Sequence, residues 1–188
     1  MIDRRVARTR ALLRRAHLSL MLEKGYDGVT VEDICEAADV GRSTFYAHYA
    51  NKEELHRDGL ETLRRQLAEH SSGVRGDGAG ALAFSLPMFE HAREHLDLYR
   101  ALAGGRGGVV ALESVRQMLS EIVRAGLPPA GEGRPDAARR EFAVRFLVGA
   151  YMAVLTGWLD DGAAASPQDM DALFRSFAGS GLAAMKPG

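Results

Sequence analysis

The sequence predicts an all-α protein built from a small N-terminal helix-turn-helix domain and a larger C-terminal helical bundle. Apolar residues recur at i, i+3, i+4 and i+7 in segments that Gly, Pro and Ser residues separate, which is the spacing of amphipathic helices. Alternating runs of β-branched residues, which mark strands, are few. Two short helical segments also flank a tight turn at residues 39–41, as in a helix-turn-helix.

Composition narrows the class of protein. Of the 188 residues, 46% are hydrophobic and 26% are charged, which is typical of a globular chain and excludes a disordered one. The single cysteine, Cys35, excludes an intrachain disulfide framework and a multi-cysteine zinc site, and we expect it to be a small buried residue. The N-terminus does not resemble a secretory signal, and the longest apolar run, residues 146–159, is shorter than the roughly 18 residues of a membrane helix. We therefore expect a cytoplasmic protein without a membrane segment.

The first half of the chain is predicted to hold four helices, over residues 5–24, 31–38, 42–48 and 51–70. The first has an apolar face at helical spacing and ends at Gly25. Thr30 and Asp33 have the spacing of a capping box, which predicts the start of the second helix. Asn51 has the character of an N-cap, because two acidic residues follow it in the first turn of the fourth helix.

The second half is predicted to hold five helices, over residues 79–93, 95–103, 109–126, 136–161 and 167–185. Residues 71–80 contain four glycines and one large apolar residue, Val74, so we expect a linker there. The predicted domains are a helix-turn-helix domain over 1–56, a connecting helix and Gly-rich linker over 57–78, and a helical domain over 79–188.

A helix that reads DNA needs one apolar face for packing and hydrogen-bond donors on the other. In the predicted helix over 42–48, Phe45 can face inward together with Val40 and Tyr49. The remaining side chains are polar, and Arg42 can pair bidentately with guanine. A corner in an ordinary helical bundle gives the same pattern, so the pattern alone leaves both interpretations open.

Charge is distributed unevenly along a chain whose net charge is −1. Residues 1–15 hold six Arg and one Asp, which gives +5, whereas residues 16–60 hold four basic and nine acidic residues, which gives −5. A basic segment at one end can be an arm that binds nucleic acid, with Arg4, Arg5, Arg8 and Arg10 as contributors. A solvated helix face explains the charge equally well.

Three runs carry a family resemblance: Gly25-Tyr-Asp-Gly-Val-Thr-Val-Glu-Asp-Ile34, Ala38-Asp-Val-Gly-Arg-Ser-Thr-Phe-Tyr-Ala-His-Tyr49 and Lys52-Glu-Glu-Leu55. Their composition and spacing resemble the DNA-binding domain of the TetR family of bacterial transcriptional regulators, most of which are repressors. The resemblance covers roughly residues 9–56. It implies a homodimer that binds a double-stranded DNA operator, and a C-terminal domain that binds a small-molecule effector.

The resemblance also implies contacts with DNA. Together with the residue types, it gives our predicted DNA contacts, which are Arg10, Thr30, Arg42, Ser43, Thr44, Tyr46, His48, Tyr49 and Lys52. Tyr46, His48 and Lys52 suit phosphate oxygens, and Thr30 places free backbone N–H groups of a helix N-terminus where a phosphate could bind.

The chain departs from the family pattern at five positions, one of which is Cys35, where the family often has Ala. Asp39 and Gly41 stand in the turn where the family often has Gly and Ser, and Ser43 replaces a frequent Gly, which can alter base preference. Asp39 is compatible with the turn because Asp tolerates the left-handed backbone. His17 stands where a small apolar residue is usual, and we expect it to be partly buried and hydrogen-bonded.

The C-terminal domain gives weaker signals. Candidate residues of an effector pocket are apolar, aromatic or His residues of the middle helices: Phe84, Met88, Phe89, His91, Tyr99, Met118, Ile122, Phe142, Phe146 and Tyr151. Trp158, Phe174 and Phe177 are candidates for a dimer interface, since the family pairs its last two long helices. Ordinary core packing is the alternative for every one of these residues.

Two further motifs resemble a metal site and a phosphate-binding loop, but simpler explanations account for them. His91 and His95 match a short metallopeptidase pattern on one helix face, but no third metal ligand is indicated. Residues 104–108 are Gly-rich, yet they lack the Lys and hydroxyl residue of a phosphate-binding loop. We therefore expect no catalytic residue, metal or cofactor. The sequence favours a ligand-responsive repressor, and the alternatives are an activator or co-regulator that binds a partner protein, and a hydrolase that uses the two histidines.

Overall fold

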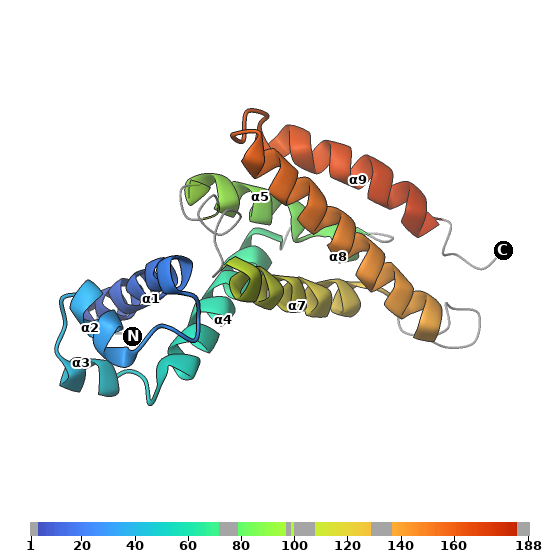
Figure 1. Cartoon of the computed structure of the whole chain (residues 1–188). Coiled ribbons are helices and arrows are strands. Elements are labelled where there is room, and N and C mark those ends of the chain that lie inside the picture. Colours follow the sequence, from blue (N-terminus) through green and yellow to red (C-terminus); the bar gives the residue numbers. More distant parts are fainter. Residues whose placement is uncertain (1–3, 72–78, 97–98, 100–107, 129–136, 184–188) are drawn as a thin grey trace. The chain divides into compact units, whose positions relative to one another are not determined.

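The computed structural model describes residues 4–71, 79–96, 99, 108–128 and 137–183, and within these residues the chain is helical, without strands (Figure 1). The chain divides into two compact units, one formed by Met1–Leu63 with Ala101–Ser114 and the other by Arg64–Arg100 with Val115–Gly188.

The first unit contains helices α1 (Arg4–Lys24), α2 (Val31–Ala37), α3 (Arg42–Tyr46) and the first part of α4 (Lys52–Ser71). One face of α1 is buried, and its residues recur at helical spacing: Leu13, Ala16, His17, Leu20 and Met21. The helix ends at Gly25, whose φ of 75° a residue with a Cβ rarely adopts. The predicted order of four helices is confirmed, with α3 two residues shorter than expected.

Side-chain caps define the starts of α2 and α4. The Thr30 hydroxyl accepts a hydrogen bond from the Asp33 backbone N–H at 3.1 Å, and the Asp33 carboxylate accepts one from the Thr30 N–H at 2.9 Å, so the predicted capping box is confirmed. The Asn51 side chain likewise accepts from the Glu54 N–H at 2.8 Å at the start of α4. Between α2 and α3, Asp39 has a φ of 51°, which is the left-handed conformation expected of this turn.

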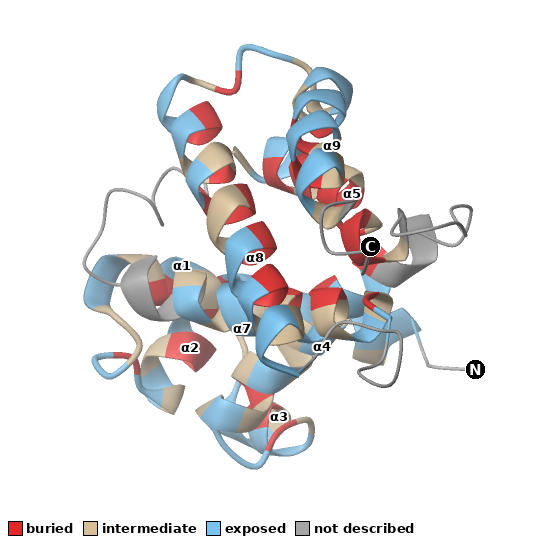
Figure 2. Ribbon diagram, turned by 90° about the vertical axis from the view of Figure 1, so that its right-hand side faces the viewer, coloured by how far each residue is buried: buried red, intermediate tan, exposed pale blue. Residues whose placement is uncertain are grey.

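The second unit contains a 3-10 turn η1 (Ala79–Leu82), α5 (Ser85–Glu94), most of α7 (Gly108–Gly126), α8 (Ala137–Asp160) and α9 (Pro167–Ala183). Buried and exposed residues alternate along α8 and α9 with helical spacing (Figure 2). Tyr151 lies at the centre of an aromatic core, with ring centroids 4.9 Å from Phe84, 4.8 Å from Phe89 and 5.1 Å from Phe174.

A buried polar network joins η1, α5 and α9 inside this apolar core. The Asp171 carboxylate accepts hydrogen bonds from the Ser85 hydroxyl and from Arg175 Nε, the latter at 2.7 Å. A second nitrogen of Arg175 donates to the Leu82 carbonyl oxygen at 2.7 Å, and the Tyr151 hydroxyl donates to the Ser85 carbonyl oxygen at 3.0 Å. Each buried polar group named here therefore has a partner, which avoids the cost of an unpaired one.

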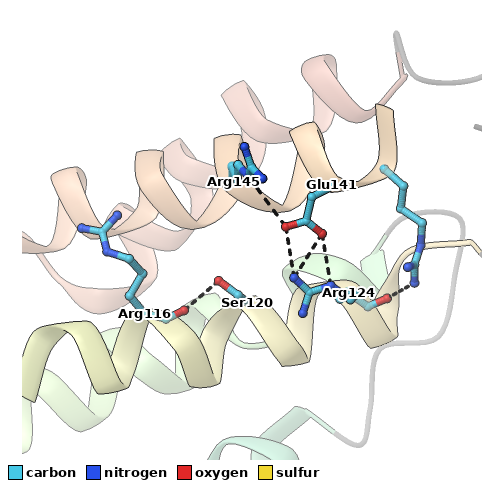
Figure 3. Close-up of polar contacts among 6 residues, drawn as sticks. Arg116, Ser120, Arg124, Glu141 and Arg145 are labelled. Carbon is cyan, nitrogen blue, oxygen red and sulfur yellow. Dashed lines mark hydrogen bonds and ion pairs between the residues drawn. The ribbon is translucent and has the colours of Figure 1, made fainter. Parts of the chain in front are cut away.

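Polar contacts also join the C-terminal end of α7 to α8 (Figure 3). The Arg124 guanidinium donates to both carboxylate oxygens of Glu141 at 3.1 to 3.3 Å, and Arg145 Nε lies 3.8 Å from the same carboxylate. Gly126 ends α7 directly against η1, because a Cβ there would lie 2.6 Å from the Gly80 carbonyl oxygen. Only glycine allows this close approach of two backbones.

The predicted C-terminal helices are found with small changes of boundary. The expected helix over 79–93 is a 3-10 turn followed by α5, and the expected helices over 109–126, 136–161 and 167–185 correspond to α7, α8 and α9. Most of the predicted linker over 71–80 and of the predicted helix over 95–103 lies outside the described residues. By length and composition α8 could cross a membrane, but half of its apolar window is buried inside the protein, as in a core helix.

Candidate DNA-binding surface

Helix α3 presents a polar surface because one residue anchors it. Phe45 is completely buried, and its ring packs edge-on against the Tyr46 ring at a centroid distance of 5.4 Å. Arg42, Ser43 and Tyr46 are exposed. Thr44 and His48 are half-buried. The apolar and polar faces predicted from the sequence are thus present in α3 and the turn that follows it.

A hollow of about 390 Å³ separates the N-terminal turns of α1 from α3. Its wall is formed on one side by Arg5, Val6 and Thr9, and on the other by the turn before α3, Thr44 and His48. The Arg-rich start of α1 therefore lies beside the polar face of α3 within the same unit. The basic start of α1 and the polar side of α3 thus face the same hollow.

Tyr49, which we predicted as a DNA contact as well as a core candidate, is a core residue. Its side chain is 3% exposed, and its hydroxyl donates a hydrogen bond to Asp58 Oδ2 at 2.6 Å. Burial and the neighbouring Asp58 raise the pKa of the Tyr49 hydroxyl, so it stays protonated. The assignment to DNA is corrected, because a buried and bonded phenol does not reach a phosphate.

Three other residues predicted to contact DNA interact with groups inside the first unit. Lys52 Nζ donates to the carbonyl oxygens of Tyr26 at 3.0 Å and Val29 at 2.9 Å. The Thr30 N–H donates to the Asp33 carboxylate, and the Thr30 hydroxyl accepts from the Asp33 N–H, in the capping box. Arg10 is half-buried, and its guanidinium lies 5.4 Å from the centroid of the Tyr49 ring. Each of these side chains helps to build the unit, and its role toward DNA stays a prediction.

An aromatic cluster beside these residues contains the unusual His17. His17 is 3% exposed, and its ring lies edge-on to Tyr26 at 6.0 Å and to His56 at 5.7 Å. Within the described part of the chain neither ring nitrogen has a hydrogen-bond partner, so the expected hydrogen bond is wrong, while the ring is more deeply buried than we expected. Burial, followed by the charges of His56 and Lys52, lowers the pKa of His17 to about 4, so the ring is neutral at neutral pH.

The residues predicted for an effector pocket do not form one surface. Six of them are buried in the core of the second unit: Phe84, Met88, Phe89, Tyr99, Met118 and Tyr151. Ile122 is half-buried, and His91 lines an open hollow of about 420 Å³ with Leu67, Glu90 and Glu94 among its neighbours. Phe142 and Phe146 are exposed on α8, so their assignment to an interior pocket is corrected.

The candidates for a dimer interface also include both buried and exposed residues. Trp158 and Phe174 are buried within the unit, where the Trp158 indole N–H donates to the Ala165 carbonyl oxygen at 3.1 Å, so core packing explains both. Phe177 is 78% exposed on α9. Phe142, Phe146 and Leu173 are also large, apolar and exposed, although we did not predict them at an interface. We call these four residues the α8/α9 apolar face.

His91 and His95 lie close together, with ring centroids 4.6 Å apart. Burial and the neighbouring His95 lower the pKa of His91 to about 4. Among the residues that the structure describes, no group of three or more His, Cys, Asp or Glu side chains is placed to hold a metal ion. Cys35 is buried, as expected, and burial raises the pKa of its thiol.

The first unit is therefore a helix-turn-helix module with a polar reading helix. Comparisons with known proteins agree with this class. Residues 12–58 match the model of bacterial regulatory proteins of the tetR family, and residues 81–179 match the model of a transcriptional regulator C-terminal region. The chain belongs to the TetR family of bacterial transcriptional regulators.

Individual relatives match mainly over the N-terminal part. An uncharacterised HTH-type transcriptional regulator, YxbF of Bacillus subtilis, is 44% identical over 70 residues, which are 37% of this chain and 18% of YxbF. IcaR of Staphylococcus epidermidis, a negative regulator of a biofilm operon, is 31% identical over 91 residues, or 46% of this chain and 49% of IcaR. The matches thus span half or less of these relatives.

Solved structures match over nearly the whole chain, at low identity. NalD of Pseudomonas aeruginosa, described as the secondary repressor of a multidrug efflux pump, is 20% identical with a TM-score of 0.63, covering 94% of this chain and 96% of NalD. A TetR-family regulator from Syntrophomonas wolfei is 18% identical with a TM-score of 0.64, covering the same shares. At such identities these matches establish the fold alone.

Proposed function

We propose that the chain is a sequence-specific DNA-binding transcriptional regulator, most simply a repressor, that works as a homodimer in the cytoplasm. The observation that carries the proposal is the exposed polar face of α3, opposite the buried Phe45, within a helix-turn-helix. Arg42 is the residue for direct reading of a guanine, and Thr44 can contact a thymine methyl group. Tyr46 and His48 would bind phosphates and fix the register.

The α8/α9 apolar face supports the homodimer. Large apolar patches are rare on the surface of monomers and usually mark an interaction site. A second copy of the same face, related by a two-fold axis, would cover Phe142, Phe146, Leu173 and Phe177. The two α3 helices of such a dimer would read a pseudo-palindromic operator with half-sites about 34–36 Å apart. A partner protein bound to this face is the alternative, and it would make the chain an activator or co-regulator.

Regulation by a small effector rests on the family and on the division into domains, which we propose to be 1–56, 57–78 and 79–188. An effector that binds one dimer geometry more tightly shifts the population toward that geometry, and DNA affinity changes by the same coupling free energy. The relative IcaR is named a negative transcriptional regulator, and this name supports repression, relieved by the effector, as the simplest form of regulation.

The test is binding to the DNA upstream of the chain's own gene, measured by fluorescence anisotropy at two salt concentrations and against a random duplex. A DNA-binding regulator with phosphate contacts should bind one duplex selectively and lose affinity steeply with salt. If that duplex is not preferred, selection from a random DNA pool follows. A pool that yields no enriched sequence would refute the proposal.

A further inference from the structure

We infer that Asp58 is a positioning residue for DNA recognition, which fixes the C-terminal end of the reading helix α3 against α1 by binding Tyr49 and Arg14. The inference rests on the proposed DNA-binding function. It adds to that function a determinant of operator selectivity that lies on α4, outside the reading helix, and that need not contact DNA.

One carboxylate oxygen holds three elements of the unit together. The Tyr49 hydroxyl donates to Asp58 Oδ2 at 2.6 Å, and Arg14 donates to the same oxygen at 2.7 Å. Arg14 belongs to α1 and Asp58 to α4, while Tyr49 lies in the segment between α3 and α4. Tyr49 is buried, and the side chains of Arg14 and Asp58 are 26% and 28% exposed, so water screens this triad less than a surface ion pair.

Helix α3 needs such an external support. It has only five residues, and helices shorter than about 12 residues are marginal on their own. Its N-cap, Gly41, contributes no side-chain hydrogen bond, and Phe45 is its single buried residue. The Tyr49 backbone N–H donates to the Phe45 carbonyl oxygen at 2.9 Å. Holding the Tyr49 ring therefore also holds the last turn of the segment that carries Arg42 and Thr44.

The charge of Asp58 distinguishes the two possible effects of this residue on DNA affinity. Burial raises the pKa of Asp58, but the hydrogen bonds from Tyr49 and Arg14 outweigh burial, so the net pKa is lowered and the carboxylate is charged at neutral pH. A negative charge in a DNA-binding unit repels phosphates. Charge alone therefore predicts that removing Asp58 strengthens binding to every duplex, whereas positioning predicts weaker binding to the operator.

The experiment compares Asp58→Ala with a matched control, Glu61→Ala. Both changes remove one negative charge from α4, and Glu61 lies on an exposed part of the helix. The probes are a duplex that the wild-type protein enriches from a random DNA pool, and a scrambled duplex of the same composition. Dissociation constants and thermal unfolding midpoints are measured for each protein.

We expect Asp58→Ala to bind the enriched duplex about tenfold more weakly than Glu61→Ala, since a charge-assisted hydrogen bond that positions α3 is lost. Binding to the scrambled duplex should be equal for the two variants. This loss of selectivity in the folded protein separates positioning from a general structural role, which would lower the unfolding midpoint and leave the selectivity of the folded fraction unchanged.

Tyr49→Phe is the second variant, because it removes only the hydroxyl and keeps the buried ring. It should weaken binding to the enriched duplex in the same direction, and Tyr49→Phe combined with Asp58→Ala should be no weaker than Asp58→Ala alone. If Asp58→Ala does not fold, the binding of Tyr49→Phe to the enriched and scrambled duplexes decides whether the inference holds.

Two results overturn the inference while leaving the regulator intact: Asp58→Ala that binds the enriched duplex as tightly as Glu61→Ala, or Tyr49→Phe with wild-type affinity and selectivity. Failure of the wild-type protein to enrich any duplex is a different outcome. It refutes DNA recognition itself, and the role of Asp58 in it.

Discussion

The ammonium group of Lys52 lies 4.7 Å from the centre of the Tyr26 ring and donates a hydrogen bond to the Tyr26 carbonyl oxygen at 3.0 Å. A second hydrogen bond, to the Val29 carbonyl oxygen, spans 2.9 Å. One side chain at the start of α4 thus holds the loop between α1 and α2 in three ways. We predicted that Lys52 contacts a phosphate, and the structure shows that it also stabilises the protein itself.

Lys52→Ala should therefore lower the free energy of unfolding by about 1–3 kcal/mol, because two carbonyl groups lose a charged donor. Its effect on the salt dependence of DNA binding should be small, since the ammonium group is already engaged. Urea unfolding and anisotropy at several salt concentrations measure the two effects. Lys24→Ala, which removes an exposed lysine paired with Asp33, is the control and should change stability less. A normal unfolding curve together with a flattened salt slope would restore the phosphate assignment.

Arg42→Ala should relax base preference at one operator position and weaken binding by about 1–3 kcal/mol, because an exposed bidentate donor at the start of α3 is lost. Anisotropy against operators with single base-pair changes measures it. Arg57→Ala removes the same charge from an exposed position of α4 and should leave the base preference unchanged. Wild-type selectivity in Arg42→Ala would show that another residue reads the base.

Phe177→Ser should convert the dimer to monomer at concentrations where the wild-type protein is dimeric, because it replaces the most exposed large side chain of the α8/α9 apolar face with a polar one. The exposed side chain has little to lose within its own unit, so the monomer should remain folded. Sedimentation equilibrium and circular dichroism separate these results. Leu12→Ser is the control, since Leu12 is an exposed apolar residue of α1. A variant that stays dimeric would place the interface elsewhere.

His17 should make the protein less stable in acid. Its pKa is about 4 in the folded protein and 6.5 in the unfolded chain, so between these values the unfolded chain binds more protons. Stability therefore falls as pH decreases below 6.5, and the loss reaches about 3 kcal/mol below pH 4. The lowered pKa of His56, caused by burial, acts with the same sign.

His17→Leu should flatten this pH dependence and raise stability at neutral pH, because it replaces an unpaired buried polar group with an apolar one. Urea unfolding at several pH values is the measurement. An unchanged slope in His17→Leu would assign the acid sensitivity to other groups.

Local patterns predicted local structure well. Capping residues gave the starts of α2 and α4, the turn residue Asp39 gave its left-handed conformation, and periodicity gave the long helices. Predictions that depended on packing between distant segments were less reliable. The Tyr49 hydroxyl contacts Asp58 of α4, a pairing that the local sequence around Tyr49 does not indicate. Phe142 is as apolar as the core residues of α8, yet it is exposed. An apolar residue in a helix that is apolar on most sides gives no signal of its direction.

The His56 ring shares a hydrogen bond of 3.2 Å with the Ser114 hydroxyl, and both residues belong to the first unit. The N-terminal unit is thus discontinuous in sequence. During synthesis all residues of this unit are present only after the ribosome has passed residue 114, so the unit cannot reach its final form before a segment of the second half of the chain has been made. A fragment that ends at residue 63 would leave His56 without this partner. Substitutions around Ser114 can therefore alter how the DNA-reading module folds, although they lie far from it in sequence.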